Sequence, residues 1–375
     1  MRITDVEALL LRQPGEIDAA AADGSQDGLL VRVHTDEGLI GIGEVDSQPH
    51  VARAVIDAPA SHKNATGLRA LLVGQDPLDV DALWRRMFEG SIYYGRRGVA
   101  LHAISGIEIA LWDIAGQAAG VPIHELLGGA RRTKVRAYAS TLMPDTPGEA
   151  RTVAAAQREA GFGAVKLGWG PFGEDADLDV SLVAAAREGL GDDAELMVDI
   201  GKGWIEVDDA IRRARRMEEY RLTWIEEPFW PDEYDKYRAL AEAIDTPIAA
   251  GEEETTIWDF ERLIDRSGVQ IVQPDVTRAG GIRECLRIAS LAQRTGRRLV
   301  THSWSTGIIK AASLHVLAVI DEAEYFECCV QTTELNQRLV RERFPVEDGF
   351  VAVPTAAGLG VTLDESVVSE CLVTP

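Results

Sequence analysis

Three acidic residues in the middle of the chain each stand at the end of a short apolar run. They are Asp199 after Leu-Met-Val, Glu226 after Thr-Trp-Ile, and Glu252 after Pro-Ile-Ala-Ala-Gly. Short apolar runs bounded by breakers are typical of buried strands in parallel sheets, so each acid is expected at the carboxyl end of a strand. Three carboxylates in one site repel one another unless a cation compensates their charge. Oxygen ligands without cysteine or histidine suit Mg²⁺.

Four further polar residues have the same relation to an apolar run, namely Lys166, Asp275, His302 and Glu327. The interval between successive members of the series accommodates one strand, one helix and two loops. A repeated strand–helix unit with its polar residue at the carboxyl end of the strand predicts a (β/α) barrel whose active site lies on that face. A doubly wound sheet uses the same units, but an open sheet would not bring seven consecutive strand ends to one point.

The elements before and after this series predict two further parts of the chain. Residues 1–128 begin with strands, including a hairpin around Asp36-Glu37-Gly38, and continue with helices, which predicts an α+β capping domain. The barrel is expected over 129–334. Residues 335–375 contain no further strand–helix unit and are expected to return to the capping domain. Two loops of that domain, 14–28 and 45–59, are expected to control substrate specificity.

Composition excludes several classes of protein. The chain has 375 residues, 46% of them hydrophobic and 26% charged, which is ordinary for a globular enzyme with a large core. A formal net charge of −23 argues against nucleic acid or an anionic membrane as a partner. We expect no run as long as a membrane span and see no basic-then-apolar signal. Four cysteines without paired spacing favour a reducing compartment, and we therefore expect a cytoplasmic protein.

The motifs around these polar residues resemble those of a known enzyme family. The relevant motifs are Trp224-Ile225-Glu226-Glu227-Pro228, Gly251-Glu252, Pro274-Asp275 with Gly280-Gly281, Gly161-Phe162-Gly163-Ala164-Val165-Lys166, and His302. Together they resemble the enolase superfamily, mandelate racemase subgroup, over essentially the whole chain. The resemblance implies a (β/α)7β-type modified TIM barrel, in the α/β class, with an α+β capping domain.

The resemblance also implies a role for each polar residue. The carboxylates Asp199, Glu226 and Glu252 resemble the three Mg²⁺ ligands of the family, where the metal holds the substrate carboxylate and stabilises an enediolate. Lys166 resembles the first lysine of the family's Lys-x-Lys strand, which adds positive charge beside that carboxylate.

The remaining three residues of the resemblance concern proton transfer and the enediolate. His302 and Asp275 resemble a His–Asp dyad in which the histidine abstracts the proton α to the carboxylate. Glu327 resembles the acid that hydrogen-bonds the developing enediolate. That role requires a protonated carboxyl, so a raised pKa is expected for Glu327. By contrast, His315 lies within an apolar helical run and is interpreted as a core residue.

Two positions depart from the family pattern. Gly168 replaces the second lysine of Lys-x-Lys, and Gly201 stands where the family commonly has asparagine. Racemisation needs an acid–base group on each face of the α-carbon, whereas only His302 is clearly a base here. The two glycines suggest room beside the metal, for which the candidate lining residues are Trp169, Lys202, Trp204 and Trp304.

We therefore predict a Mg²⁺-dependent dehydratase of a small anionic hydroxy acid, an acid sugar, that eliminates the β-hydroxyl and yields a 2-keto-3-deoxy acid. The first alternative is a racemase or epimerase of a 2-hydroxy acid that uses His302 and Lys166 as its two bases. A more remote alternative is a non-catalytic relic that binds a metal or ligand. The family resemblance further implies a homo-oligomer, either a dimer or an octamer.

Overall fold

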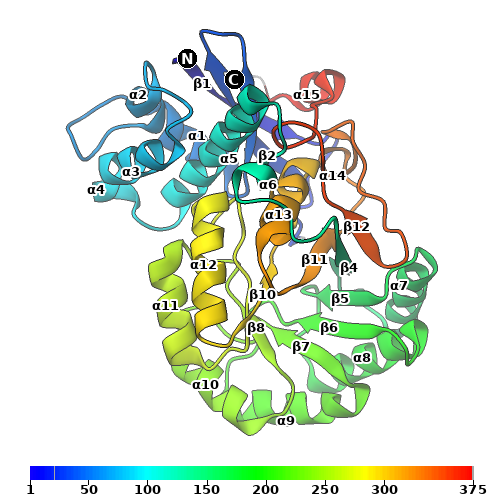
Figure 1. Ribbon diagram of the computed structural model, residues 1–375. Helices are drawn as coiled ribbons and strands as arrows, with labels where there is room; N and C mark the ends of the chain where they lie inside the picture. Colours follow the sequence, from blue (N-terminus) through cyan, green and yellow to red (C-terminus); the bar gives the residue numbers. More distant parts are fainter. Residues whose placement is uncertain (21, 374–375) are drawn as a thin grey trace.

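The computed structural model describes residues 1–20 and 22–373, which form a barrel and a smaller module that covers one end of it (Figure 1). The module begins with an antiparallel sheet of β1 (Ile3–Arg12), β2 (Asp27–Thr35) and β3 (Ile40–Val45). Its helices are α1 (Pro49–Asp57), α2 (Leu68–Leu72), α3 (Val80–Gly90), α4 (Ile92–Gly95), α5 (Val99–Ala119) and α6 (Ile123–Leu126). The strands-then-helices order is therefore the one predicted, including the hairpin between β2 and β3.

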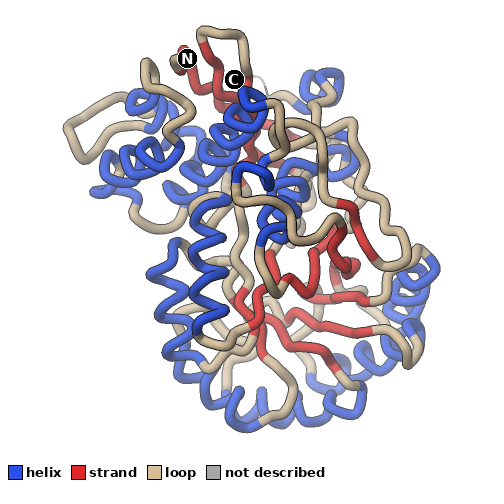
Figure 2. Tube along the Cα trace, in the orientation of Figure 1, coloured by secondary structure: helices blue, strands red, loops and turns tan. Residues whose placement is uncertain are grey.

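The second body is a closed parallel barrel, with strands inside and helices outside (Figure 2). Its strands are β4 (Lys134–Leu142), β5 (Ala164–Gly168), β6 (Glu195–Asp199), β7 (Leu222–Glu226), β8 (Ile248–Ala250), β9 (Ile271–Val272), β10 (Arg298–Thr301) and β11 (Ala323–Cys329). Each pairs in parallel with the next, and β11 pairs with β4, so the sheet closes. This confirms the (β/α)7β-type barrel and excludes an open doubly wound sheet.

One helix follows each of the first seven barrel strands. The helices are α7 (Pro147–Glu159), α8 (Ala176–Leu190), α9 (Val207–Met217) with the 3-10 turn η1 (Glu218–Tyr220), α10 (Tyr234–Ala243), α11 (Thr256–Ser267), α12 (Ile282–Arg294) and α13 (Gly307–Val319). Three of them begin with a capping side chain, as at Thr146, Asp175 and Thr306. Such caps satisfy backbone N–H groups that a helix leaves free at its start.

Inside the barrel, every strand contributes one buried side chain to a single cluster. The members are Tyr138, Ala164, Met197, Trp224, Ala249, Ile271, Val300 and Tyr325. The three large aromatic rings pack edge to face, with centroids 5.5 to 6.0 Å apart. Because this cluster fills the interior, the barrel has no open pore, and polar side chains at the carboxyl ends of the strands lie above an apolar floor.

The segment after the barrel contacts both bodies. It contains α14 (Glu334–Arg338), β12 (Phe350–Ala352) and α15 (Glu365–Cys371), and β12 pairs antiparallel with β4. Near the end, the backbone N–H of Val373 donates to the Leu10 carbonyl at 2.9 Å, so the last part of the described chain lies against β1 of the module. We propose the division into 1–128, 129–334 and 335–375 as the domain organisation of this chain.

Helix α5 corrects one expectation from composition. Its residues Val99–Ala119 are long and apolar enough to cross a membrane, although no run of that length was expected. The helix is nevertheless mostly buried, and most of its apolar residues belong to the core that the module's strands and helices share. A core helix of this kind is weak evidence for a membrane span.

Two buried acids of the module bind the first turns of barrel helices. Glu108 of α5 accepts hydrogen bonds from the backbone N–H groups of Ile282, at 2.8 Å, and Arg283, at 3.1 Å, where α12 begins. Glu44 of β3 accepts from the hydroxyl of Thr306 at 2.6 Å, at the start of α13. The carboxyl oxygens accept hydrogen bonds from groups that a helix leaves free at its start, so these acids join the module to the barrel.

The glycine pair of the family motif makes this junction possible. Gly281 has φ +97, and a Cβ atom there would lie 2.2 Å from a carboxylate oxygen of Glu108. Only glycine combines that backbone conformation with so close an approach. The neighbouring N–H of Gly280 donates to Ser105 of α5 at 2.9 Å. The pair therefore serves packing between module and barrel.

The junction makes stability depend on pH. Burial raises the pKa of Glu108 from 4.5 to about 7 against its hydrogen bonds, so the folded chain favours the protonated form. The stabilisation that comes from a protonated Glu108 carboxyl is complete below pH 4.5 and is lost as the pH rises through about 7. Relative to Glu108→Gln, the wild-type free energy of unfolding should fall by about 3 kcal/mol across this range. Denaturant unfolding of both proteins from pH 4.5 to 8 measures the difference; parallel profiles would contradict it.

Candidate active site

All seven predicted site residues meet at the carboxyl ends of the barrel strands, and all are buried. Lys166 and Glu327 lie within β5 and β11, while Asp199 and Glu226 are the last residues of β6 and β7. Glu252, Asp275 and His302 follow β8, β9 and β10. The parallel register of the closed barrel brings these residues together although they span 166–327 in the chain.

The three carboxylates form a compact cluster. One oxygen each from Asp199, Glu226 and Glu252 lies within 4.8 Å of the others. The ammonium group of Lys166 forms ion pairs with Glu226, with Glu327 at 2.8 Å and with Asp199 at 3.9 Å. Burial and the neighbouring Glu226 raise the pKa of Asp199 well above its usual range, against the effect of Lys166. Buried, mutually repelling oxygen donors of this kind fit a divalent metal ion.

Hydrogen bonds from neighbouring groups orient the cluster. The indole N–H of Trp224 and the amide of Gln273 donate to the same oxygen of Glu226, at 2.8 and 2.7 Å. Trp169 and the backbone N–H of Gly201 donate to different oxygens of Asp199, at 3.0 and 2.8 Å. Such outer partners hold metal-ligating carboxylates in place.

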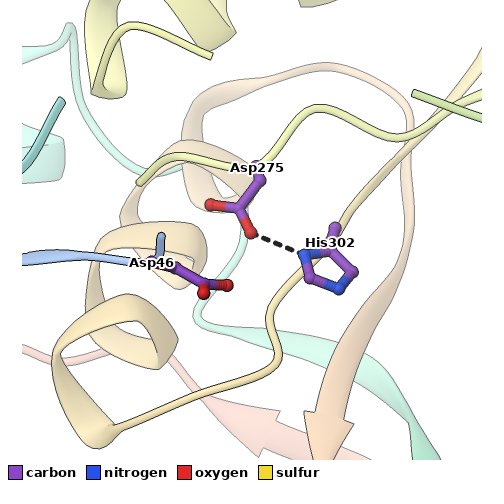
Figure 3. Close-up of side chains that lie close together, drawn as sticks. All are labelled: Asp46, Asp275 and His302. Carbon is purple, nitrogen blue, oxygen red and sulfur yellow. Dashed lines mark hydrogen bonds and ion pairs between the residues drawn. The ribbon is translucent and has the colours of Figure 1, made fainter. Parts of the chain in front are cut away.

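Asp275 and His302 form a hydrogen-bonded pair (Figure 3). The Nδ1 atom of His302 lies 2.5 Å from Asp275, whose other oxygen accepts from the N–H and hydroxyl of Thr277, both at 2.6 Å. The Nε2 atom of His302 lies 3.2 Å from Glu252. Burial lowers the pKa of His302, but Glu252, Glu327 and Asp275 together raise it to about 10. The geometry therefore fixes the ring by Nδ1 and directs Nε2 toward the carboxylate cluster.

Glu327 differs from expectation in its protonation. It accepts from the backbone N–H of Ser303 at 2.7 Å and pairs with Lys166 at 2.8 Å. Burial acts to raise its pKa, but the positive charges of Lys166 and His302 outweigh burial, so the pKa of Glu327 is lowered. The expected raised pKa is wrong for this arrangement because the prediction did not include the adjacent ammonium group.

The capping module reaches the site through Asp46 (Figure 3). The Asp46 carboxylate lies 2.8 Å from the guanidinium of Arg278, which is also 3.3 Å from Glu252. Arg278 was not among the predicted site residues. The signal in the sequence that could have identified Arg278 is its position three residues after Asp275, in a loop that follows a strand. Asp46 lies in the loop 45–59, which was expected to control substrate specificity.

A cavity of about 260 Å³ adjoins these groups, lined by both bodies. The module contributes Ala22 and Gly24, and the end of β4 contributes Ser140, Thr141 and Leu142. The β4 residues were missed because the series of polar strand ends was started at Lys166. The same pattern, an apolar strand ending in polar residues, is present at Ser140-Thr141.

The space expected beside the two glycines exists beside Gly168, which lines the cavity, but not beside Gly201. A Cβ atom on Gly168 would lie 2.3 Å from Cβ of Asp199, and one on Gly201 would lie 2.7 Å from the indole ring of Trp169. Trp169 and Trp304 line the cavity, whereas Trp204 is only 2% exposed and is not part of its wall. Lys202 lies over the Trp169 ring, 4.1 Å from its centroid. The prediction of room beside the carboxylates is therefore confirmed at Gly168, whereas the indole of Trp169 occupies the space beside Gly201.

Comparison with known proteins identifies relatives over the full chain. Residues 4–128 match the mandelate racemase / muconate lactonizing enzyme N-terminal domain, and residues 149–367 match the enolase C-terminal domain-like family. The chain is 32% identical to D-galactarolactone cycloisomerase of Agrobacterium fabrum, covering 99% of this chain and 98% of the relative. It is 34% identical to D-galactonate dehydratase of Ralstonia nicotianae, covering 91% and 90%. The structure of a racemase from Streptomyces coelicolor with bound magnesium matches with a TM-score of 0.87 and 30% identity, covering 99% and 100%.

Proposed function

The chain belongs to the mandelate racemase subgroup of the enolase superfamily, and we propose that it is a Mg²⁺-dependent dehydratase of an acid sugar. The observation that carries this proposal is the one-sided supply of bases. The His302–Asp275 pair stands at β9 and β10, while position 168 on β5 is glycine. A single base suits proton abstraction followed by elimination better than racemisation, which needs a base on each face.

In the proposed site, Asp199, Glu226 and Glu252 hold Mg²⁺. The bound ion would supply positive charge to the substrate carboxylate and to the negative charge that develops when the α-proton leaves. Lys166 adds a fixed ammonium group beside the carboxylate cluster, and Glu327 holds that ammonium in place through its 2.8 Å contact. Glu327 therefore acts through Lys166 in our proposal, because its lowered pKa keeps it ionised.

His302 moves the proton. A cation held by Glu252 would offset the carboxylate charge that raises the pKa of His302, which would leave the ring neutral. Its Nε2 atom then takes the hydrogen α to the carboxylate, and Asp275 stabilises the resulting imidazolium through Nδ1. The electron pair of the broken C–H bond forms the C=C bond as the C–O bond to the β-hydroxyl breaks. The proton on His302 passes to the departing hydroxide, which leaves as water. The enol product tautomerises to a 2-keto-3-deoxy acid.

Ring opening of an acid-sugar lactone is the second candidate function. It begins with the same α-proton abstraction, but the leaving oxygen stays attached to the product. The 32% identity to a cycloisomerase over 99% of the chain favours this candidate.

The racemase alternative has less support from the site. Lys166 would have to act as a base, yet Glu226 and Glu327 outweigh burial and raise the pKa of its ammonium well above the usual value. An ammonium paired with two carboxylates keeps its proton and serves as a cation. The alternative of a non-catalytic relic would require that an intact His302–Asp275 pair and an intact carboxylate cluster support no turnover.

One screen separates these functions. The enzyme with Mg²⁺ is incubated in D₂O with aldonic acids, aldaric acids and their lactones, and 2-keto acids are trapped with semicarbazide. Keto acid from open-chain acids supports the dehydratase, and keto acid from lactones alone supports ring opening. Deuterium at the α-carbon with inverted configuration and no keto acid selects the racemase. If the metal-bound enzyme shows no turnover and no exchange with any compound of the library, all three functions are contradicted.

Two further properties stay predictions. The family resemblance suggests a dimer or an octamer, which light scattering on the purified protein measures directly. Composition and free cysteines suggest a cytoplasmic location; Cys285, Cys328, Cys329 and Cys371 are all unpaired and buried. The substrate is expected to be a small anionic hydroxy acid.

A further inference from the structure

We propose that Trp169 is a positioning residue whose indole N–H holds Asp199 in its metal-binding orientation. This inference rests on the metal site of the proposed function but not on the identity of the substrate or reaction. Trp169 follows β5, and its indole N–H donates to Oδ2 of Asp199 at 3.0 Å. The backbone N–H of Gly201 donates to Oδ1 of the same carboxylate at 2.8 Å. Both oxygens of this proposed ligand are therefore held by groups outside the carboxylate cluster.

The backbone at Trp169 is unusual for so large a residue. Its φ is +59, in the left-handed region, which a bulky side chain rarely adopts. Local contacts maintain this conformation: the Trp169 N–H donates to the Asp199 carbonyl at 3.1 Å, and its carbonyl accepts from Phe172 at 3.2 Å. The strained conformation places the indole over the end of β6, where Asp199 stands.

The two glycines that depart from the family pattern belong to the same arrangement. A Cβ atom on Gly201 would lie 2.7 Å from the Trp169 ring, so a side chain at 201 would push the indole away. A Cβ atom on Gly168 would lie 2.3 Å from Cβ of Asp199. Gly168, Trp169 and Gly201 therefore form one unit in which the indole and the carboxylate fit together.

A cation lies over one face of the ring. The ammonium of Lys202 lies 4.1 Å from the centroid of the Trp169 ring, and it is itself paired with Glu253 at 2.8 Å and Glu227 at 3.4 Å. A desolvated cation over an indole is an attractive contact, and here Lys202 is largely buried. The ring is thus held by Lys202 on its face and bonded to Asp199 at its edge.

The consequence is that Asp199 is oriented before a metal ion binds. Partners of this kind typically contribute 10–100-fold to metal affinity, because a free carboxylate must otherwise be immobilised on binding. Trp304 also lines the cavity, but its indole N–H donates to Asp23 at 3.2 Å and not to a member of the carboxylate cluster. The chain therefore contains a matched tryptophan for comparison.

The test is calorimetric titration of Mg²⁺ into metal-free protein without substrate. Trp169→Phe keeps a ring and removes the N–H, and we expect its Kd for Mg²⁺ to be about 10–100-fold higher than that of the wild type. Trp304→Phe should bind Mg²⁺ within about twofold of the wild type, because its lost N–H serves Asp23. Trp169→Tyr is a second replacement, with the same expected loss, in case the first does not fold. Thermal unfolding of each variant separates a positioning effect from a general loss of structure.

The outcomes decide between the two proposals. Unchanged Mg²⁺ affinity in folded Trp169→Phe, or an equal loss in Trp304→Phe, would overturn the inference. A wild-type protein that binds no Mg²⁺ would overturn both the inference and the metal dependence. If the wild type binds Mg²⁺, Trp169→Phe weakens it and no acid sugar reacts, the inference stands while the proposed function fails.

Discussion

His302→Asn should abolish both turnover and exchange of the α-proton with solvent. His302 is the base we propose, with Nδ1 held by Asp275 at 2.5 Å and Nε2 directed toward the carboxylate cluster. Asparagine is close in size and can donate an amide N–H to Asp275, so the surrounding packing should survive. It has no group that accepts a proton near neutral pH. A general base contributes typically ~10²–10⁴-fold, and we expect losses of that order in kcat.

The measurement is proton NMR in D₂O on a substrate found by the screen, with keto acid measured in parallel. Both signals report the same abstraction step and should fall together. His34→Asn is the matched control, because His34 lies on β2 of the capping module, 3.5 Å from Glu7, and outside the site. The control should exchange and turn over like the wild type. If His302→Asn exchanges the α-proton at the wild-type rate, His302 is not the base. Either Lys166 is then the base or the protein is not catalytic.

Glu226→Gln should cost the protein its metal binding as well as its activity. Glu226 is the middle member of the carboxylate cluster, and its two oxygens serve opposite partners. One faces the ammonium of Lys166, and the other accepts from Trp224 and Gln273. Glutamine loses the charge, and its amide nitrogen must face either the ammonium or the two donors. Because an outer partner alone typically contributes 10–100-fold, loss of a direct ligand should weaken Mg²⁺ binding by more than about 100-fold.

Calorimetry with Mg²⁺ on the metal-free variant measures this loss, and the deuterium-exchange assay reports the activity. Glu227→Gln is the matched control at the next position. Glu227 is also buried, but its contact is with Lys202 at 3.4 Å, and it is not a member of the carboxylate cluster. We expect the control to bind Mg²⁺ nearly as the wild type does. Full Mg²⁺ affinity in Glu226→Gln would mean that the metal ligands are other residues.

The polar strand ends were predictable because a parallel barrel imposes a regular pattern on sequence. Each buried strand is a short apolar run, and the residue at its carboxyl end is placed by the backbone alone. Asp199, Glu226, Glu252 and His302 could therefore be located from the end of each apolar run. The closed sheet then required these positions to meet, which the structure confirms in their geometry.

Residues that enter the site from other directions were not predictable in this way. Asp46 belongs to the capping module and meets Arg278 across a distance of 232 residues in sequence. Their pairing depends on how the module docks on the barrel, through contacts such as those of Glu108 with the start of α12. Nothing in the local pattern around either residue encodes that docking.

The sequence by itself determined the barrel, the capping module and the positions of the seven polar residues, because strand periodicity and strand ends are local properties. Only the tertiary structure decided the protonation of Glu327, whose pKa depends on Lys166 and His302 from other strands. It also decided the meaning of the two glycines. From sequence both suggested an open space, whereas the structure has a cavity beside Gly168 and places the indole of Trp169, which bonds to Asp199, beside Gly201. Charge and volume in a buried site are set by neighbours distant in sequence, and those neighbours are known only once the chain has folded.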